Sequence, residues 1–194
     1  MNIANYITLL RVVIIPFFPV IYLKYNFFKI PLHLMPYCLL LILVFCEITD
    51  LIDGFIARKK NQVTDLGKIM DPMADSITNI SVFFTFTQSW VGIPLLLVFV
   101  FLYREFFIST LRTICALKGV ALAARKSGKI KTLLQATVGI IIVLLLIPFT
   151  LGDISLEHLQ WISLSLVSVS AIYSVISAVD YIYVNRSHLK VFFK

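Results

Sequence analysis

Charged residues are scarce in this chain of 194 residues, because only 14% are Asp, Glu, Lys or Arg, whereas a soluble domain carries about 25%. Cysteine is nearly absent, and three cysteines without paired spacing exclude a disulfide framework. Apolar residues, by contrast, make up 60% of the chain. This composition excludes a disordered chain, an ordinary soluble enzyme and a nucleic-acid-binding arm, so no nucleic-acid partner is expected. It indicates a polytopic integral membrane protein.

Long apolar runs predict six transmembrane helices within a single domain, residues 1–194. Each run is close to the roughly 20 residues that a bilayer core requires. A short segment before the first run, residues 2–11, is expected to lie at the membrane interface, and no cleavable signal peptide is recognisable. We therefore expect an all-α fold, a six-transmembrane-helix bundle with a short N-terminal interfacial segment. The predicted spans are residues 12–28, 34–57, 69–88, 91–111, 133–151 and 159–184.

Basic residues predict the orientation of these spans. Six spans would place most of the 17 Lys and Arg residues on one side of the membrane, together with both termini. The opposite side would hold only Lys24 and Lys29, and Arg104 would fall inside a span. By the positive-inside rule, both termini face the cytoplasm. Because no transit peptide is visible, the bacterial plasma membrane is the expected location.

The acidic residues lie where a lipid environment would not tolerate them alone. Six of the ten fall between residues 47 and 75. One carboxylate in hydrocarbon costs at least about 2.5–3.5 kcal/mol, so these groups must face a polar cavity or bind cations. Helical spacing predicts two stripes that can face each other near the cytoplasmic surface. The first stripe holds Asp50, Asp53, Gly54 and Ala57, and the second holds Gly67, Asp71 and Asp75.

Four aspartates from two facing helices offer oxygen ligands and no soft ones. Such a set suits hard divalent cations, Mg²⁺ or Mn²⁺, rather than zinc or copper. Two such ions about 3.5–4 Å apart are the usual clamp for phosphoryl displacement, for which Arg58 would be a phosphate ligand. A divalent-cation transporter would also need intramembrane carboxylates. Against it, the acids gather at one side of the membrane with no relay across the other spans.

The same residues form a recognisable motif. Asp50-Leu-Ile-Asp53-Gly54-Phe-Ile-Ala57-Arg58 is followed, after eight residues, by Gly67-Lys-Ile-Met-Asp71-Pro-Met-Ala-Asp75. All eight fixed positions match the signature of the CDP-alcohol phosphatidyltransferases, and the chain resembles that family over nearly its whole length. The resemblance implies a membrane enzyme, commonly a homodimer, that uses two divalent cations and acts on CDP-diacylglycerol among membrane lipids.

The resemblance also implies a role for each position. Asp50, Asp53 and Asp71 would bind the two metal ions, and Asp75 would complete the metal site and act as the general base. Gly54, Ala57 and Gly67 would leave room for the cytidine nucleotide, and Arg58 would bind its phosphates. The acceptor oxygen would attack the phosphorus that bears the lipid, and CMP would leave.

Shorter segments bear on the acceptor. Residues 103–112 and 127–132, and more weakly 177–185, are similar to the branch of the family whose acceptor is glycerol-3-phosphate. A phosphorylated acceptor requires cations beside the metal site, whereas serine or inositol would not. Phosphatidylglycerol, serine or inositol phosphate stay open as acceptors, and so does a binding-only relative. The expected substrate-binding residues are Asn5, Thr8, Arg104, Arg112, Lys129 and Lys131.

Three residues depart from the family pattern. Ala4 replaces a common Pro, and Ser76 stands where Lys is common in this branch. Glu47 lies one turn before Asp50, where small or apolar residues are more usual. We expect Glu47 to make a helix-packing hydrogen bond rather than to bind metal. Glu105 is expected to pair with a neighbouring Arg rather than to act in catalysis.

Overall fold

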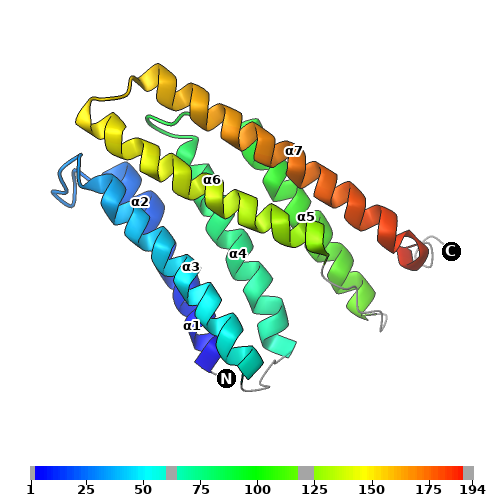
Figure 1. The fold of residues 1–194 in the computed structure, drawn as a ribbon. Coiled ribbons are helices and arrows are strands. Elements are labelled where there is room, and N and C mark those ends of the chain that lie inside the picture. The colour runs from blue at the N-terminus through cyan, green and yellow to red at the C-terminus, as the bar shows by residue number, and fades with distance from the viewer. Residues whose placement is uncertain (1–2, 60–64, 118–124, 190–194) are drawn as a thin grey trace.

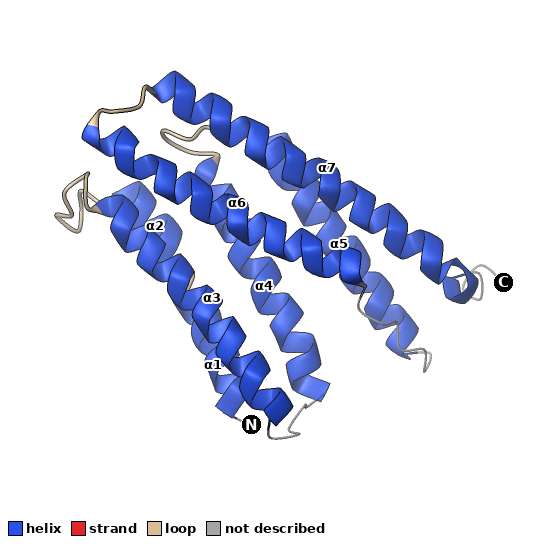
Figure 2. Cartoon of the chain, in the orientation of Figure 1, coloured by secondary structure: helices blue, strands red, loops and turns tan. Residues whose placement is uncertain are grey.

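A computed structural model describes residues 3–59, 65–117 and 125–189, which form helices and connecting turns and include no strand (Figures 1 and 2). The all-α prediction is therefore confirmed. The helices are α1 (Ile3–Ile14), α2 (Phe17–Lys24), α3 (Met35–Lys59), α4 (Asp65–Phe86), α5 (Leu95–Leu117), α6 (Lys126–Leu151) and α7 (Leu156–Leu189).

The N-terminal apolar region differs from its prediction. Instead of an interfacial segment followed by one span, it forms two helices, α1 and α2, that are separated at Ile15 and Pro16. Proline has no N–H to donate, and its ring clashes with the carbonyl four residues earlier, so the α1 ladder cannot continue through Pro16. Residues Tyr6–Lys24 together still form an apolar stretch of 19 residues that could cross a membrane.

Helices α1 and α2 run in the same direction, and from α2 on each helix runs opposite to the one before it (Figure 1). At one end, which we call the site end, lie the starts of α1, α4 and α6 and the ends of α3, α5 and α7. The connections 25–34, 87–94 and 152–155 lie at the opposite end. Helix α1 packs against both α3 and α4, and α6 packs against α3, α4 and α7. Residues far apart in the sequence are thereby brought together at the site end.

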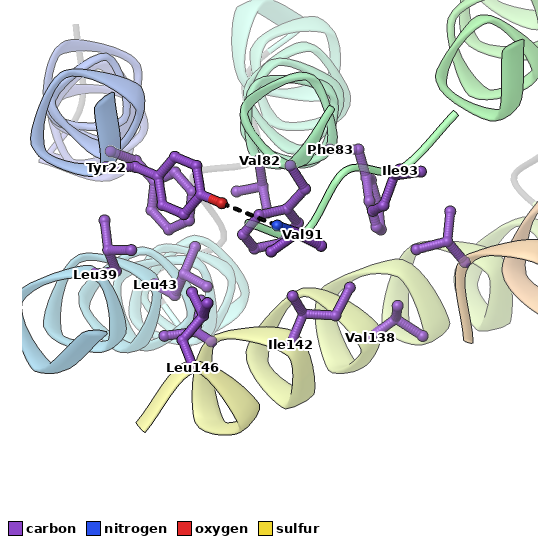
Figure 3. Close-up of a cluster of buried hydrophobic side chains, with 14 of the residues drawn as sticks. Tyr22, Leu39, Leu43, Val82, Phe83, Val91, Ile93, Val138, Ile142 and Leu146 are labelled. Atoms are coloured by element: carbon purple, nitrogen blue, oxygen red, sulfur yellow. Dashed lines mark hydrogen bonds between the residues drawn. The ribbon is translucent and has the colours of Figure 1, made fainter. Parts of the chain in front are cut away.

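An apolar core joins the helices away from the site end (Figure 3). Leu39 and Leu43 of α3 pack with Val82 of α4 and with aliphatic side chains of α6. The buried Tyr22 hydroxyl donates a hydrogen bond to the Gln88 carbonyl (3.2 Å) and accepts one from the Val91 N–H (3.4 Å). This core fixes the helices relative to one another, and the buried charged residues lie outside it, towards the site end.

Large apolar side chains also cover the outside of the bundle. Leu96 is 77% exposed and Leu41 is 70% exposed, and many other large apolar side chains on the outer faces are exposed as well. A soluble monomer rarely exposes apolar surface on this scale, whereas a bilayer solvates it. The apolar helices therefore indicate a multi-pass membrane protein.

Four of the described stretches are long and apolar enough to cross a membrane: Tyr6–Lys24, Met35–Ile52, Lys126–Leu151 and Leu156–Arg186. The predicted number of six is thus not confirmed. Helices α4 and α5, of 22 and 23 residues, are long enough to cross a membrane, but neither is among these four, and both carry charged side chains. Asp71 and Asp75 interrupt the apolar run of α4, and Arg104, Glu105 and Arg112 interrupt that of α5.

Two helices extend beyond their predicted limits at the site end. The predicted spans end at residue 111 and resume at residue 133, but α5 continues to Leu117 and α6 begins at Lys126. Hydropathy predicts only the apolar part of a helix, because it indicates which residues meet lipid. The backbone hydrogen bonds of α5 and α6 continue beyond that part into the polar residues. Lys129 and Lys131 therefore project from a helix. Pro72 likewise lies inside α4 rather than at its start.

Candidate active site

Two of the predicted metal ligands meet at a buried arginine. Arg11 of α1 donates from Nη1 to Asp50 Oδ1 of α3 at 2.7 Å and to Asp75 Oδ1 of α4 at 3.0 Å. The Arg11 side chain is only 3% exposed. Charge-assisted hydrogen bonds of this kind are roughly twice as strong as neutral ones. Asp50 and Asp75, although 25 residues apart, are therefore held side by side, as the two predicted stripes require.

Helix α1 also contacts the third aspartate. Thr8 lies one turn before Arg11, is fully buried, and donates from Oγ1 to Asp71 Oδ1 at 3.1 Å. Thr8 was predicted to bind substrate, whereas no role in the site was predicted for Arg11. The signal that could have identified Arg11 is its spacing from Thr8, because residues three apart share one face of a helix.

Several predicted site residues lie in the described helices, but their side chains are outside the described part. Asp53, Gly54, Ala57 and Arg58 belong to the last turns of α3, Gly67 to the first turn of α4, and Asn5 to α1. The backbone thus places them at the site end. Their roles stay predictions.

A cavity of about 280 Å³ opens beside the paired aspartates. It brings together three predicted residues, Asp50, Asp75 and Lys129. It also exposes groups that sequence analysis did not assign to the site. The remaining lining residues are Arg11, Cys46, Glu47, Leu51, Thr78, Asn79, Thr132, Leu133 and Ala136.

Two of the predicted phosphate-binding cations surround Glu105. Arg104 Nη1 lies 3.2 Å from Glu105 Oε1, and Lys131 Nζ of α6 forms an ion pair with the same oxygen. Ser76, the residue after Asp75, donates to Glu105 Oε2 at 3.0 Å. Arg104 Nη2 donates to Ser177 Oγ of α7 at 2.9 Å. The expected pairing of Glu105 with an arginine is confirmed, and this network links α4, α5, α6 and α7 next to Asp75.

Arg112 lies apart from the residues that line the cavity. Its Nε donates to the Tyr181 hydroxyl at 3.3 Å, and its guanidinium lies 5.4 Å from the centre of that ring. Two further contacts connect the start of α6 to Asp180 of α7. Arg125 Nε lies 3.0 Å from Asp180 Oδ2, and Ser127 Oγ donates a hydrogen bond to the same oxygen at 2.6 Å. The segment from Ser177 to Tyr181 thus orients Arg104 and Arg112 of α5 and Arg125, which directly precedes α6.

The acidic residues at the site end decide whether the site suits a metal ion. Within the described side chains, no three His, Cys, Asp or Glu residues lie close enough to hold one, and the Asp53 side chain is outside that set. Asp50 and Asp75, however, already share one cationic nitrogen, so their carboxylates converge on a position that favours positive charge. Carboxylate oxygens without nitrogen or sulfur donors fit Mg²⁺ or Mn²⁺.

Because Arg11 joins three helices, its replacement should loosen the site. We expect Arg11→Leu to lower the free energy of unfolding by about 2–4 kcal/mol, since the partly exposed carboxylates of Asp50 and Asp75 lose a buried charged donor. Arg11→Lys should recover part of this loss, because an ammonium keeps the charge but not the fork. Thermal unfolding in detergent measures both variants. Equal stability of Arg11→Leu and the unmodified protein would contradict the bridging role.

Comparison with known proteins agrees with the family resemblance of the sequence motif. The family model described as CDP-alcohol phosphatidyltransferase matches residues 1–177. A Bacillus subtilis protein named CDP-diacylglycerol–glycerol-3-phosphate 3-phosphatidyltransferase is 31% identical over 196 residues, which is 97% of each chain. Proteins of the same name from Rickettsia bellii and Escherichia coli K12 are 40% and 34% identical over 69% of this chain, and over 70% and 72% of their own.

Proposed function

The chain belongs to the CDP-alcohol phosphatidyltransferase family, and from that premise we propose that it transfers a phosphatidyl group from CDP-diacylglycerol to glycerol-3-phosphate. The products would be phosphatidylglycerophosphate and CMP. The observation that carries this proposal is a cation-rich network placed directly beside the paired aspartates, joined to Asp75 through Ser76 and Glu105. The names of these relatives support the same acceptor.

The network leaves a surplus of positive charge for an anionic acceptor. Glu105 neutralises only one of its two partners, Arg104 and Lys131. Lys129 and Arg112 have no carboxylate partner among the described residues. A phosphate group suits this surplus, because arginine offers a bidentate fork and lysine a point charge. Serine, which carries no phosphate, would not need it.

The proposed transfer uses residues of this site. A hydroxyl oxygen of the acceptor forms a bond to the phosphorus that carries diacylglycerol, while the bond from that phosphorus to the bridging oxygen breaks. CMP leaves with the bridging oxygen, and the hydroxyl proton passes to the Asp75 carboxylate. Arg11 holds Asp75 Oδ1 and thereby orients the base. Divalent ions bound by Asp50, Asp53, Asp71 and Asp75 would neutralise the pyrophosphate charge.

The donor substrate would approach from the membrane. The exposed apolar faces allow the two acyl chains to lie against the bundle, while the nucleotide reaches the site end. There Gly54, Ala57 and Gly67 would leave room for it and Arg58 would bind its phosphates. Counting α1 and α2 as one span, the proposed arrangement has six spans, with both termini and the site on the cytoplasmic side. A homodimer completes the proposed assembly.

Lys129 provides a test of the acceptor site. It lines the cavity, so Lys129→Met is expected to raise KM for glycerol-3-phosphate about 10-fold, because one charged phosphate ligand is lost. KM for CDP-diacylglycerol should change less than twofold. Lys126→Met is the matched control, since Lys126 is exposed on the same helix outside the cavity lining. Equal KM values for both variants would contradict the assignment.

Release of CMP from CDP-diacylglycerol tests the proposed function. Purified protein in mixed micelles with Mg²⁺ would receive glycerol-3-phosphate, phosphatidylglycerol, serine or inositol phosphate, one at a time. We expect turnover with glycerol-3-phosphate alone. Turnover with another acceptor would keep the chemistry and overturn the acceptor, and no turnover with any of them would favour a binding or transport role.

A further inference from the structure

A second, smaller hollow adjoins the cavity beside the paired aspartates. This narrow hollow of about 10 Å³ shares Glu47, Thr78, Asn79 and Ala136 with the main cavity. Its other walls are small or apolar: Leu43 and Val82, which Figure 3 shows in the core, together with Gly139 and Ile140. A space of this size holds about one water molecule or one hydroxyl group.

Three polar side chains form the border between the two hollows, and we call them the polar floor: Glu47, Thr78 and Asn79. Glu47 lies one turn before Asp50 on α3, and Thr78 lies one turn after Asp75 on α4. Because α3 and α4 run in opposite directions, both steps lead away from the site end, by about 5 Å per turn. The polar floor therefore lies one helical turn deeper than Asp50 and Asp75.

The polar floor has hydrogen-bonding capacity that the protein does not use. Thr78 is 8% exposed, and its hydroxyl is buried without a hydrogen-bond partner. In the described part of the chain, the side chains of Glu47 and Asn79 make no hydrogen bond or ion pair, so the helix-packing bond expected for Glu47 is not found. Buried polar groups are nearly always paired, and an unpaired hydroxyl or carboxylate at a cavity wall indicates a polar ligand.

The charges around the cavity indicate how a ligand is oriented in it, with its anionic group on one side and its hydroxyl groups on the other. Lys129 of α6 offers a cation for an anionic group, while Glu47 offers only lone pairs and so selects a hydrogen-bond donor. Asp75, the proposed base, lies between the polar floor and the site end. A ligand that fits this order carries an anionic group, a reacting hydroxyl at Asp75 and a second hydroxyl next to it.

We infer that the polar floor binds the non-reacting hydroxyl group of a phosphorylated polyol acceptor, with Glu47 accepting its hydrogen bond. This inference rests on the proposed function and adds a specificity determinant to it. In glycerol-3-phosphate the group concerned is the hydroxyl on the middle carbon, adjacent to the carbon whose hydroxyl reacts. Glu47 is thereby a substrate-binding residue that selects polyols and takes no part in the bond changes.

The test compares glycerol-3-phosphate with 3-hydroxypropyl phosphate, which keeps the reacting hydroxyl and the phosphate but lacks the middle hydroxyl. CMP release gives kcat/KM for each acceptor. We expect the unmodified protein to prefer glycerol-3-phosphate by at least about 10-fold, because a hydrogen bond to a charged group is lost with the analogue. Glu47→Gln replaces the charged acceptor by a neutral amide oxygen, which accepts a weaker hydrogen bond, and should therefore reduce this preference to less than about threefold, by slowing glycerol-3-phosphate and not the analogue.

Two further variants make the result decisive. Thr78→Val removes the unpaired hydroxyl and should lower the preference in the same direction, even if Glu47→Gln folds poorly. Glu157→Gln removes an exposed carboxylate at the opposite end and should keep the full preference. If both polar-floor variants lowered the rates with the two acceptors equally, the polar floor would be structural and the inference overturned. An unmodified protein that released CMP with both acceptors equally well would overturn it while the proposed transfer stood, and one that released none would overturn both.

Discussion

Replacing Asp75 by Asn is expected to lower CMP release with glycerol-3-phosphate about 1,000-fold. General base catalysis contributes typically 10²–10⁴-fold, and an amide cannot accept the proton. The same substitution also removes one carboxylate from the proposed metal site. The amide oxygen can still accept the hydrogen bond from Arg11 Nη1, which lies 3.0 Å from Asp75 Oδ1, so the helices should stay together. The loss should therefore be in kcat, with a thermal midpoint close to that of the unmodified protein.

Asp153→Asn is the matched control for this experiment. Asp153 is exposed in the connection between α6 and α7, at the end of the bundle away from the site. The control makes the same chemical change and should keep full activity. A folded Asp75→Asn protein with more than about a tenth of the normal rate would contradict the assignment of Asp75 as the base.

Replacing Glu105 by Gln is expected to lower the free energy of unfolding by about 3–5 kcal/mol, because removing one partner of a buried ion pair leaves an uncompensated charge. The cations involved are deeply buried: the side chains of Arg104 and Lys131 are 8% and 3% exposed. Ser76 would lose a charged acceptor as well. In a chain of this length the change corresponds to a fall in Tm of roughly 10 °C, measurable by thermal unfolding in detergent.

A double variant separates lost charge balance from lost packing. Adding Lys131→Met to Glu105→Gln removes the cation that the first change leaves unpaired, and it should restore at least half of the lost stability. Glu157→Gln, at the exposed start of α7, should cost less than about 1 kcal/mol. If Glu105→Gln matched Glu157→Gln in stability, or if the double variant were less stable than Glu105→Gln, the buried network would not stabilise the fold.

Much of the helix pattern could be predicted from the sequence, because apolar runs long enough for a bilayer are also long enough for a helix. The ends of the helices were harder to predict where charged residues belong to the helix. Lys129 and Lys131 end the hydropathy signal, yet α6 continues through them to Lys126. The break at Pro16 was also missed, because the residues on both sides of it are apolar and hydropathy is insensitive to a single missing N–H.

The site shows a similar division between local and long-range information. Helical spacing was enough to place Asp50 and Asp71 on two stripes, because the residues of each stripe share one helix. Arg11 contacts Asp50, which lies 39 positions away in the sequence, and Asp75, which lies 64 positions away. Both contacts depend on the packing of α1 against α3 and α4. The unpaired state of Glu47 depends in the same way on its neighbours from α4 and α6. Such contacts follow from the packing of the bundle and cannot be read from spacing.

The most direct test of phosphatidyl transfer follows both products at once. Purified protein would be incubated with CDP-diacylglycerol, Mg²⁺ and radiolabelled glycerol-3-phosphate, and the label in extracted lipid would be compared with the CMP released. The proposed function predicts equal molar amounts of labelled lipid and CMP, and loss of both when the divalent cation is chelated. Release of CMP without labelled lipid, or no release at all from folded protein, would contradict it.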